Sequence, residues 1–337
     1  AHPRCRCTPA PSVPREALPP VKPEPEKKKP APKKTPAKKK KTAQPEETTA
    51  PRPKLTAAEA RAQIAEVHAR REAGYQELSV EYDQACKKAE MSSQAHWDLH
   101  QRKYGGDRSK WTKEEEAQLQ SLYDEWLKDT EEIKGILQRR AQYGTQTAKE
   151  LRSVLAVQNP AKLTMITAGK PKKDTRATWE AGVDGFSQLV DDSLITAGSS
   201  AKPVFKSTRQ QRSYFDPVDS TVNMYSKSGR ATVVHELGHW LEEVNPAIRS
   251  KAVDFLERRT QGESESWLGS GYSSRETARR DKFLRPYMGK IYKDRNGKYY
   301  ATEIVSMGLE YMYDDPYTLA KDDPDYFDFI YGLARGE

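Results

Sequence analysis

The sequence predicts an α+β domain at its C-terminal end, preceded by an α-helical hairpin and a disordered Pro/Lys-rich tail. Three compositional segments along the 337 residues support this division. Proline and lysine dominate the first 54 residues, a proline-free stretch rich in Ala, Glu, Gln, Arg and Leu follows, and short strand-like and helix-like patterns alternate after residue 160. With 35% hydrophobic residues and a mean hydropathy of −0.93, the chain has too little apolar material to be globular throughout.

The net positive charge of the chain lies in the tail. Residues 1–54 carry 15 Lys and Arg against 5 Glu and hold 14 of the 22 prolines. Because proline lacks a backbone donor and neighbouring lysines repel one another, residues 9–55 are expected to form an extended, disordered linker. Residues 22–54 could contact nucleic acid weakly through its phosphates, but no aromatic side chain lies among the lysines to stack on bases, which favours a solvated linker.

Cysteine usage and hydropathy indicate the compartment. Three cysteines, at positions 5, 7 and 86, cannot all pair within the chain, which favours a reducing environment. No run approaches the roughly 20 apolar residues that a membrane span needs, and the first residues contain no apolar signal segment, so we expect a protein that is neither secreted nor membrane-bound. The missing initiator Met suggests a piece of a longer chain. His2, Cys5 and Cys7 are an incomplete ligand set for a metal of their own.

Residues 56–158 are predicted to form the helical hairpin. Helices are expected near 56–90 and 112–143, with a break at Gly105-Gly106 and a shorter third helix near 145–157. Charged faces of this hairpin could bind a partner, but a spacer or assembly stalk is the simpler interpretation. Each long helix opens with a capping-box pattern, a Thr followed three residues later by a Glu: Thr56 with Glu59, and Thr112 with Glu115.

Residues 160–337 are expected to form the α+β domain. Short strands are predicted at 202–205 and 221–225, with a turn at 214–217 between them. A β-hairpin is predicted where two Tyr-containing segments flank Asn296-Gly297, since this dipeptide suits a tight turn. Helices are predicted at four places: 231–246, 247–261, 301–314 and 324–334.

The most informative motif is His235-Glu236-Leu237-Gly238-His239. On a helix its apolar residues share one face, and the two histidines lie one turn apart on the opposite face. Histidines at this spacing can direct their ring nitrogens toward one ion, with Glu236 beside them. Zinc-dependent hydrolysis needs this set: two neutral His ligands, an open position for water, and a carboxylate that accepts the water's proton.

A third protein ligand is expected to be a carboxylate, because no histidine follows His239. Glu303 is the first candidate, since it lies opposite the apolar face of a predicted helix. Glu310 shares that face two turns later and is either an alternative ligand or an acceptor for a histidine N–H.

These residues resemble the zincin metallopeptidases of the glutamate-ligand type over about 200–337, most specifically over 232–242. The resemblance implies a zincin-like metallopeptidase fold, one Zn²⁺ ion bound by His235, His239 and Glu303, and Glu236 as the general base. It implies a polypeptide substrate whose peptide bond is hydrolysed. Tyr300, one turn before Glu303, is our candidate for supporting the oxyanion, although Tyr287, Tyr292 and Tyr299 are also near in sequence.

Other segments are similar to zincin-like domains of tailed-phage head-morphogenesis, or minor head, proteins. The resemblance implies that residues 1–8 are the remnant of an upstream minor head domain, that capsid or portal proteins are partners, and that the protein is found in the virion or the host cytoplasm. The segments that carry it are His2-Pro3-Arg4-Cys5-Arg6-Cys7, Tyr287-Met288-Gly289-Lys290, Ala301-Thr302-Glu303, Ser306-Met307-Gly308, Asp323-Pro324-Asp325-Tyr326-Phe327 and Leu333-Ala334-Arg335-Gly336.

Two other functions remain open at this stage. The chain could be a structural component of a virion without catalytic activity, with a metal site that only stabilises the fold. It could also be an assembly protein that contacts nucleic acid through its tail. For a peptidase, we expect the strand at 222–225 to be an edge strand that holds the substrate backbone.

Overall fold

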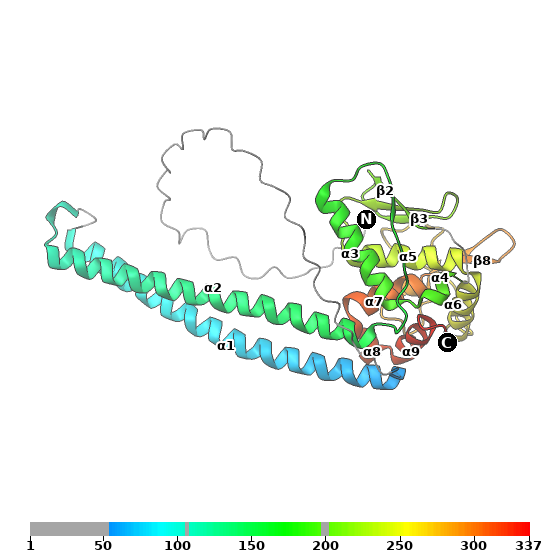
Figure 1. The fold of residues 1–337 in the computed structure, drawn as a ribbon, viewed down its shortest axis with the longest axis horizontal. Helices are drawn as coiled ribbons and strands as arrows, with labels where there is room; N and C mark the ends of the chain where they lie inside the picture. Colours follow the sequence, from blue (N-terminus) through cyan, green and yellow to red (C-terminus); the bar gives the residue numbers. More distant parts are fainter. Residues whose placement is uncertain (1–53, 105–107, 197–201) are drawn as a thin grey trace, which may run out of the picture.

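The computed structural model describes residues 54–104, 108–196 and 202–337, which form a long helical hairpin joined to a mixed α+β domain (Figure 1). The sequence therefore predicted the fold class correctly at the level of α+β. The predicted remnant at 1–8, nearly all of the basic linker and the weak ligand set near the N-terminus lie outside the described residues.

Helices α1 (Ala57–Tyr104) and α2 (Lys113–Leu155) make up the hairpin, with a short 3₁₀ turn, η2 (Arg108–Lys110), before α2. Both predicted capping boxes are present. The predicted ends were wrong: α1 continues to residue 104, and α2 includes the segment expected to be a separate third helix. At 48 residues, α1 is about 70 Å long.

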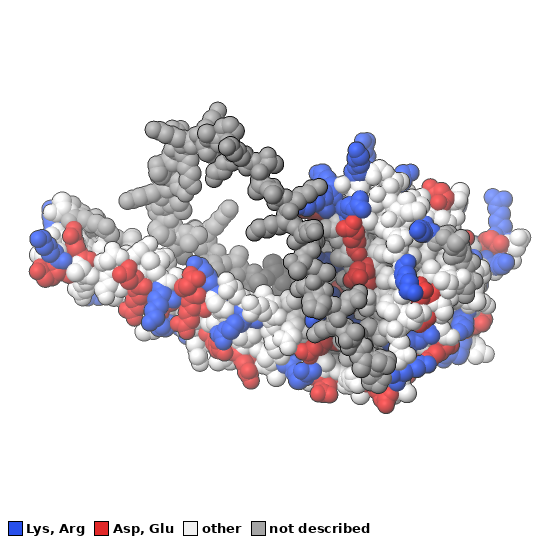
Figure 2. All heavy atoms as spheres, in the orientation of Figure 1, with Lys and Arg blue, Asp and Glu red and all other residues white. Residues whose placement is uncertain are grey.

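Close packing explains why α2 continues through a glycine. A Cβ at Gly144 would lie 2.5 Å from the hydroxyl of Tyr75, and a Cβ at Gly74 would overlap the ring of Tyr143. The Tyr143 hydroxyl donates to the carbonyl of Arg70 at 2.7 Å. The two glycines therefore allow α1 and α2 to approach each other closely, and Gly144 does not end α2. On the face shown in Figure 2, acidic and basic side chains are interspersed along the hairpin.

The base of the hairpin is fixed to the domain by polar and aromatic contacts. Arg61 makes two hydrogen bonds to Asp328, of 2.9 and 3.2 Å, and His68 stacks on Tyr317 with ring centroids 3.5 Å apart. These contacts join α1 to α8 (Pro316–Asp322) and α9 (Pro324–Leu333). The far end of the hairpin projects away from the domain (Figure 1).

A four-stranded sheet lies at one side of the domain, in the order β1 (Ile166–Ala168), β2 (Val204–Thr208), β4 (Thr221–Tyr225) and β3 (Tyr214–Asp216). β1, β2 and β4 are parallel, and β3 is antiparallel to β4. Two predictions were wrong. Residues 214–216 form an edge strand rather than a turn, and the strand at 221–225 is interior, since it pairs on both sides. Its first four residues are buried on both faces, which hides the alternation typical of an edge strand.

Helix α5 contacts strands β3 and β4 of this sheet, and it also packs against α3 and α7. The four helices predicted from the sequence are present with shifted ends. The Asn-Gly hairpin is present as well, with Gly297 at a φ of 78°. Among the described residues, no helix is long and apolar enough to span a membrane. The remaining elements are α3 (Lys173–Leu189), α4 (Asp192–Thr196), α5 (Arg230–Val244), α6 (Pro246–Arg259), β5 (Ser266–Trp267), β6 (Thr277–Ala278), η3 (Pro286–Gly289), β7 (Tyr292–Lys293), β8 (Tyr299–Ala301) and α7 (Ile304–Asp314).

Candidate metal centre

Helix α5 carries the two histidines of the sequence motif on one side. Val233, Leu237 and Trp240 are fully buried, and this apolar face anchors the helix in the core. The side chains of His235 and His239 keep 13% and 15% of their surface exposed. The amphipathic pattern therefore places both imidazoles at the border between core and solvent.

Glu303 lies 64 residues after His239 in the chain. It is the N-cap residue of α7, one position before the helix begins, and it is fully buried. Helix α7 approaches α5 closely at Gly238, where a Cβ would lie 2.5 Å from the Cα of Ser306. The glycine inside the motif thus allows the approach that brings Glu303 to the histidines.

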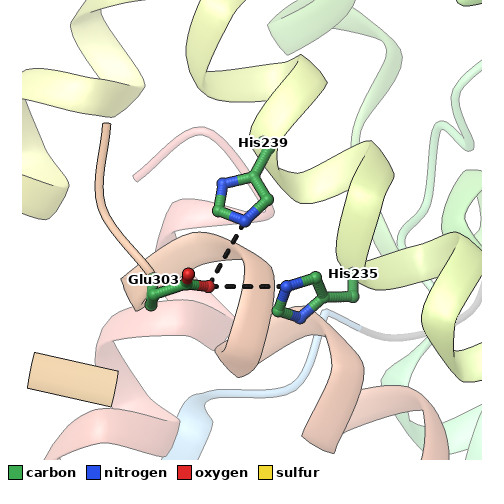
Figure 3. Close-up of side chains that lie close together, drawn as sticks. All are labelled: His235, His239 and Glu303. Atoms are coloured by element: carbon green, nitrogen blue, oxygen red, sulfur yellow. Dashed lines mark ion pairs between the residues drawn. The ribbon is translucent and has the colours of Figure 1, made fainter. Parts of the chain in front are cut away.

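His235, His239 and Glu303 form a cluster that could bind a metal ion (Figure 3). The Nε2 atoms of His235 and His239 lie 3.4 and 3.3 Å from Oε2 of Glu303. Ligands placed 2.0–2.1 Å from a tetrahedral zinc ion are separated by about 3.3 Å. The two distances to Glu303 are therefore compatible with a shared ion, and all three donor atoms lie within 4.8 Å of one another.

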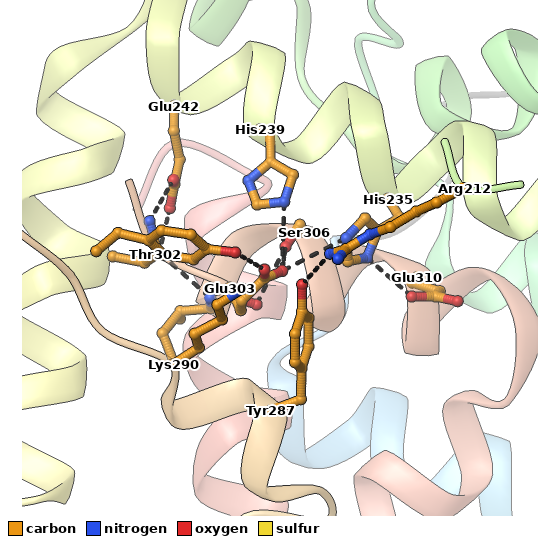
Figure 4. A network of polar contacts seen from close by, with 12 residues as sticks. Arg212, His235, His239, Glu242, Tyr287, Lys290, Thr302, Glu303, Ser306 and Glu310 are labelled. Atoms are coloured by element: carbon orange, nitrogen blue, oxygen red, sulfur yellow. Dashed lines mark hydrogen bonds and ion pairs between the residues drawn. The ribbon is translucent and has the colours of Figure 1, made fainter. Parts of the chain in front are cut away.

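Other side chains orient His235 and Glu303 (Figure 4). Glu310 places Oε2 2.9 Å from Nδ1 of His235, which leaves Nε2 directed at the cluster. The Tyr292 hydroxyl donates to Oε1 of Glu303 at 2.6 Å, and the Ser306 hydroxyl donates to Oε2 at 2.9 Å. Glu310 thus contacts the outer ring nitrogen and lies outside the cluster that Glu303 completes.

The close packing of these groups shifts their pKa values. Burial lowers the pKa of His235, but the hydrogen bond with Glu310 and the charge of Glu303 outweigh burial and raise it to about 9. The pKa of His239 is also raised, because the charge of Glu303 outweighs burial. Burial favours the neutral acid of Glu303, yet the two histidines hold the pKa of this carboxyl well below its usual range. Two imidazoles and one carboxylate at this spacing attract positive charge strongly.

Glu236 is 5% exposed and lines the same cleft as the three cluster residues. Burial, the largest influence, raises its pKa above the usual value, and the neighbouring histidines oppose that rise. A carboxylate whose pKa is raised is a stronger proton acceptor at neutral pH. The cleft therefore holds a buried carboxylate in addition to the three cluster residues.

The cleft beside the cluster has a volume of about 160 Å³. A larger cavity, of about 680 Å³, lies at the base of the hairpin, and its lining contains none of the cluster residues. The smaller cleft is the candidate site, because His235, His239 and Glu303 all line it. The lining of the smaller cleft consists of Arg212, Ser213, Tyr214, Phe215, Pro217, His235, Glu236, His239, Glu242, Glu243, Arg249, Tyr287, Tyr292, Tyr300, Ala301 and Glu303.

The four tyrosines considered from the sequence occupy different positions. Tyr300 lines the cleft but is 50% exposed. The Tyr299 hydroxyl donates to Glu257, outside the cleft, and the Tyr292 hydroxyl is engaged by Glu303. The Tyr287 hydroxyl accepts a hydrogen bond from Arg212 at 2.7 Å. Tyr300 is thus at the mouth of the cleft, and Tyr287 is held beside the cluster.

Sequence reasoning missed Arg212, Ser306 and the bond from Tyr292 to Glu303. The contact of Arg212 with Tyr287 joins residues 75 positions apart, and that of Tyr292 with Glu303 joins residues 11 apart, so no spacing pattern indicates them. Ser306 follows Glu303 by three residues, and this local contact could have been found once Glu303 was the candidate ligand. Comparisons with models of protein families, with curated proteins and with solved structures found no match to this chain.

Proposed function

We propose that this chain is a zinc-dependent peptidase whose C-terminal domain is zincin-like. The observation that carries the proposal is the spacing of the two histidine nitrogens and the Glu303 oxygen, with the buried Glu236 next to them. Two imidazole donors and one carboxylate donor favour zinc over magnesium or calcium, which prefer all-oxygen sites.

The fold around the cluster is consistent with a peptide substrate. β3 is an edge strand, and Tyr214 and Phe215 of this strand line the cleft. An extended peptide can pair with such an edge through its backbone, independently of its side chains. This proposal replaces the interior strand at 221–225, which has no free edge.

In the proposed reaction Glu236 accepts a proton from the attacking water and then delivers it to the amine that leaves. His235, His239 and Glu303 would hold the ion, with Glu310 and Tyr292 keeping their donors in position. When bound, zinc would supply Lewis acidity, which lowers the pKa of coordinated water toward about 7 and polarises a carbonyl group. The Tyr287 hydroxyl, whose oxygen accepts a hydrogen bond from Arg212 beside the cluster, is our candidate for supporting the oxyanion. Tyr300 remains the alternative donor, reaching in from the mouth of the cleft.

The substrate setting is proposed from the resemblance to phage head proteins. We propose that the natural substrate is a polypeptide of a phage particle or of its host. The hairpin, whose first helix is about 70 Å long, would then hold the peptidase domain away from a partner bound at the far end of the hairpin.

Glu236→Gln tests the proposal against the rival function, a structural protein with a silent metal site. The zinc-loaded chain should cleave a denatured-protein or peptide library, and Glu236→Gln should reduce the rate at least 10³-fold while binding one equivalent of zinc and keeping its far-UV spectrum. Glu303→Gln should lose both zinc and activity. Asp254→Asn, which changes an exposed carboxylate of α6 that does not line the cleft, should retain both. Cleavage that persists in Glu236→Gln would contradict the assignment of the base, and a wild-type chain that binds zinc without any turnover would favour the structural function.

A further inference from the structure

Arg212 places a cationic side chain at the metal cluster. It belongs to the loop between β2 and β3, lines the cleft and donates from Nη2 to the Tyr287 hydroxyl at 2.7 Å (Figure 4). The charges that act on it include those of Glu303 and Glu236. A guanidinium from outside the sequence motif therefore faces the same space as the proposed ligands and base.

The loop that carries Arg212 is anchored at the next residue. Ser213 is buried, and its Oγ accepts a hydrogen bond of 3.0 Å from the backbone N–H of Tyr225. The same oxygen lies 2.7 Å from Oγ of Ser228, so it is bound on two sides. Since Tyr225 ends β4 and Tyr287 is buried in η3, Arg212 is held between two well-fixed points. A side chain positioned in this way is ready to bind a ligand with little loss of entropy.

The charge of Arg212 has no close partner within the part of the chain that the structure describes. Its one hydrogen bond goes to a neutral hydroxyl, and no described carboxylate oxygen lies within 4.0 Å of it. Arg249, which lines the same cleft, differs: it binds the Glu242 carbonyl and the Glu243 carboxylate. Guanidinium groups at a cleft are commonly paired with carboxylates, because a planar fork of donors fits two oxygens. Arg212 keeps donors available for such a pair.

We propose that Arg212 forms a carboxylate-binding subsite, so that the cleft selects peptides with a carboxylate next to the bond that is cut. The carboxylate can be an Asp or Glu side chain or the C-terminus of the peptide, because both present the same two oxygens. This inference rests on the proposed peptidase function. An ion in the cage would compensate the charge of Glu303, so that this carboxylate would no longer offset the charge of Arg212 for an anionic substrate group.

Thiol ligands test the subsite without requiring turnover. A thiolate binds zinc, so mercaptoacetate, 3-mercaptopropionate and 4-mercaptobutyrate would present a carboxylate at increasing distances from the ion, and the corresponding amides are uncharged controls. Affinities for the zinc-loaded full chain are measured by calorimetry. At least one acid should bind about tenfold or more tighter than its amide. Arg212→Gln should remove this preference, and Arg209→Gln, which changes an exposed arginine three residues earlier in the same loop, should retain it.

These outcomes separate the two proposals. Thiols that bind with equal affinity as acid and amide, or a preference that survives in Arg212→Gln, would overturn the subsite while leaving the metal centre intact. No binding of any thiol to a chain that takes up zinc would overturn an open coordination position, and the peptidase and the subsite with it.

Peptide libraries then identify the source of the carboxylate. A library with free C-termini is compared with the same library after amidation, and cleavage sites are mapped by mass spectrometry. Loss of cleavage on amidation indicates a terminal carboxylate, whereas enrichment of Asp and Glu beside the cut bond in both libraries indicates a side chain. Arg212→Glu should move the preference toward Lys and Arg. Profiles that are the same in the wild type, Arg212→Gln and Arg212→Glu would contradict the subsite.

Discussion

Gly238 lies against the backbone of Ser306, so closely that a methyl group at position 238 would come within 2.5 Å of the Ser306 Cα. This contact joins α5, which carries both histidines, to α7, whose N-cap residue is Glu303. Since the obstacle is backbone and not the end of a flexible side chain, it cannot move aside without shifting a helix. The spacing of the cluster therefore depends on a hydrogen atom at this position.

Gly238→Ala is expected to lower the free energy of unfolding by about 2–3 kcal/mol through overpacking, and to weaken zinc binding because α7 and Glu303 are displaced. Urea denaturation and zinc titration measure the two effects. Gly135→Ala is the matched control: this glycine lies inside α2 with nothing within 4 Å of an added Cβ. That change should stabilise the chain by about 0.5–1 kcal/mol, since alanine is the better helix former. Equal zinc affinity in Gly238→Ala and the wild type would show that the helices do not set the ligand spacing.

Tyr292→Phe removes the hydroxyl that donates to Glu303 at 2.6 Å. We expect zinc affinity to fall about tenfold or more, because the carboxylate loses the bond that orients it. Tyr299→Phe removes a hydroxyl with the same 2.6 Å bond length to a glutamate, but that partner is Glu257. The control should alter stability and leave zinc affinity unchanged. A competition titration against a coloured chelator gives both constants, and an equal loss in the two variants would argue against a specific role for Tyr292.

Glu310→Ala removes the carboxylate that contacts Nδ1 of His235 at 2.9 Å. Without this acceptor the imidazole can rotate or change tautomer, so zinc affinity should fall about 10–100-fold. Glu310→Gln should lose less, because its amide oxygen can still accept from the ring N–H. The control is Asp314→Asn, an exposed carboxylate one turn later on α7. If Glu310→Ala binds zinc as tightly as Asp314→Asn, the outer contact does not hold the ligand.

Glu242 should make the stability of the metal-free chain depend on pH. This side chain is 2% exposed and accepts hydrogen bonds from the backbone N–H and the hydroxyl of Thr302. Burial raises its pKa from the usual 4.5 to about 7. Between these values the folded state keeps a proton that the unfolded state has released, so stability falls as pH rises from about 4.5 to 7, by up to a few kcal/mol, and then levels off.

Glu242→Gln should remove that part of the slope, because glutamine keeps both contacts with Thr302 without a titratable group. Urea denaturation at half-unit steps between pH 4.5 and 8 measures the effect in the wild type, in Glu242→Gln and in Asp254→Asn, which changes an exposed carboxylate of α6. The last should follow the wild type. Identical slopes for all three chains would mean that Glu242 is ionised in the folded protein throughout this range.

The elements that were predicted correctly are those whose structure depends on residues close together in the chain. Capping boxes at Thr56 and Thr112 and the turn at Gly297 were predicted because each depends on residues within one turn of the chain. The separate helix predicted near 145–157 was wrong, since α2 continues through Gly144, which packs against Tyr75 of the other helix. The strand at 214–216 was missed for the same reason: it is short, and its pairing with β4 supplies the hydrogen bonds that make it a strand.

The sequence alone determined the pair of histidines and the position of Glu236, because a spacing of four residues on an amphipathic helix sets their directions within a single element. It also determined that the net positive charge of the chain lies in the first 54 residues, where 15 Lys and Arg face only 5 Glu. The tertiary structure decided between Glu303 and Glu310 for the third position, and it brought Tyr292 and Arg212 to the cluster. Those residues come from elements whose approach depends on backbone contacts such as that of Gly238 with Ser306, and no spacing along the chain encodes contacts between elements that are far apart in it.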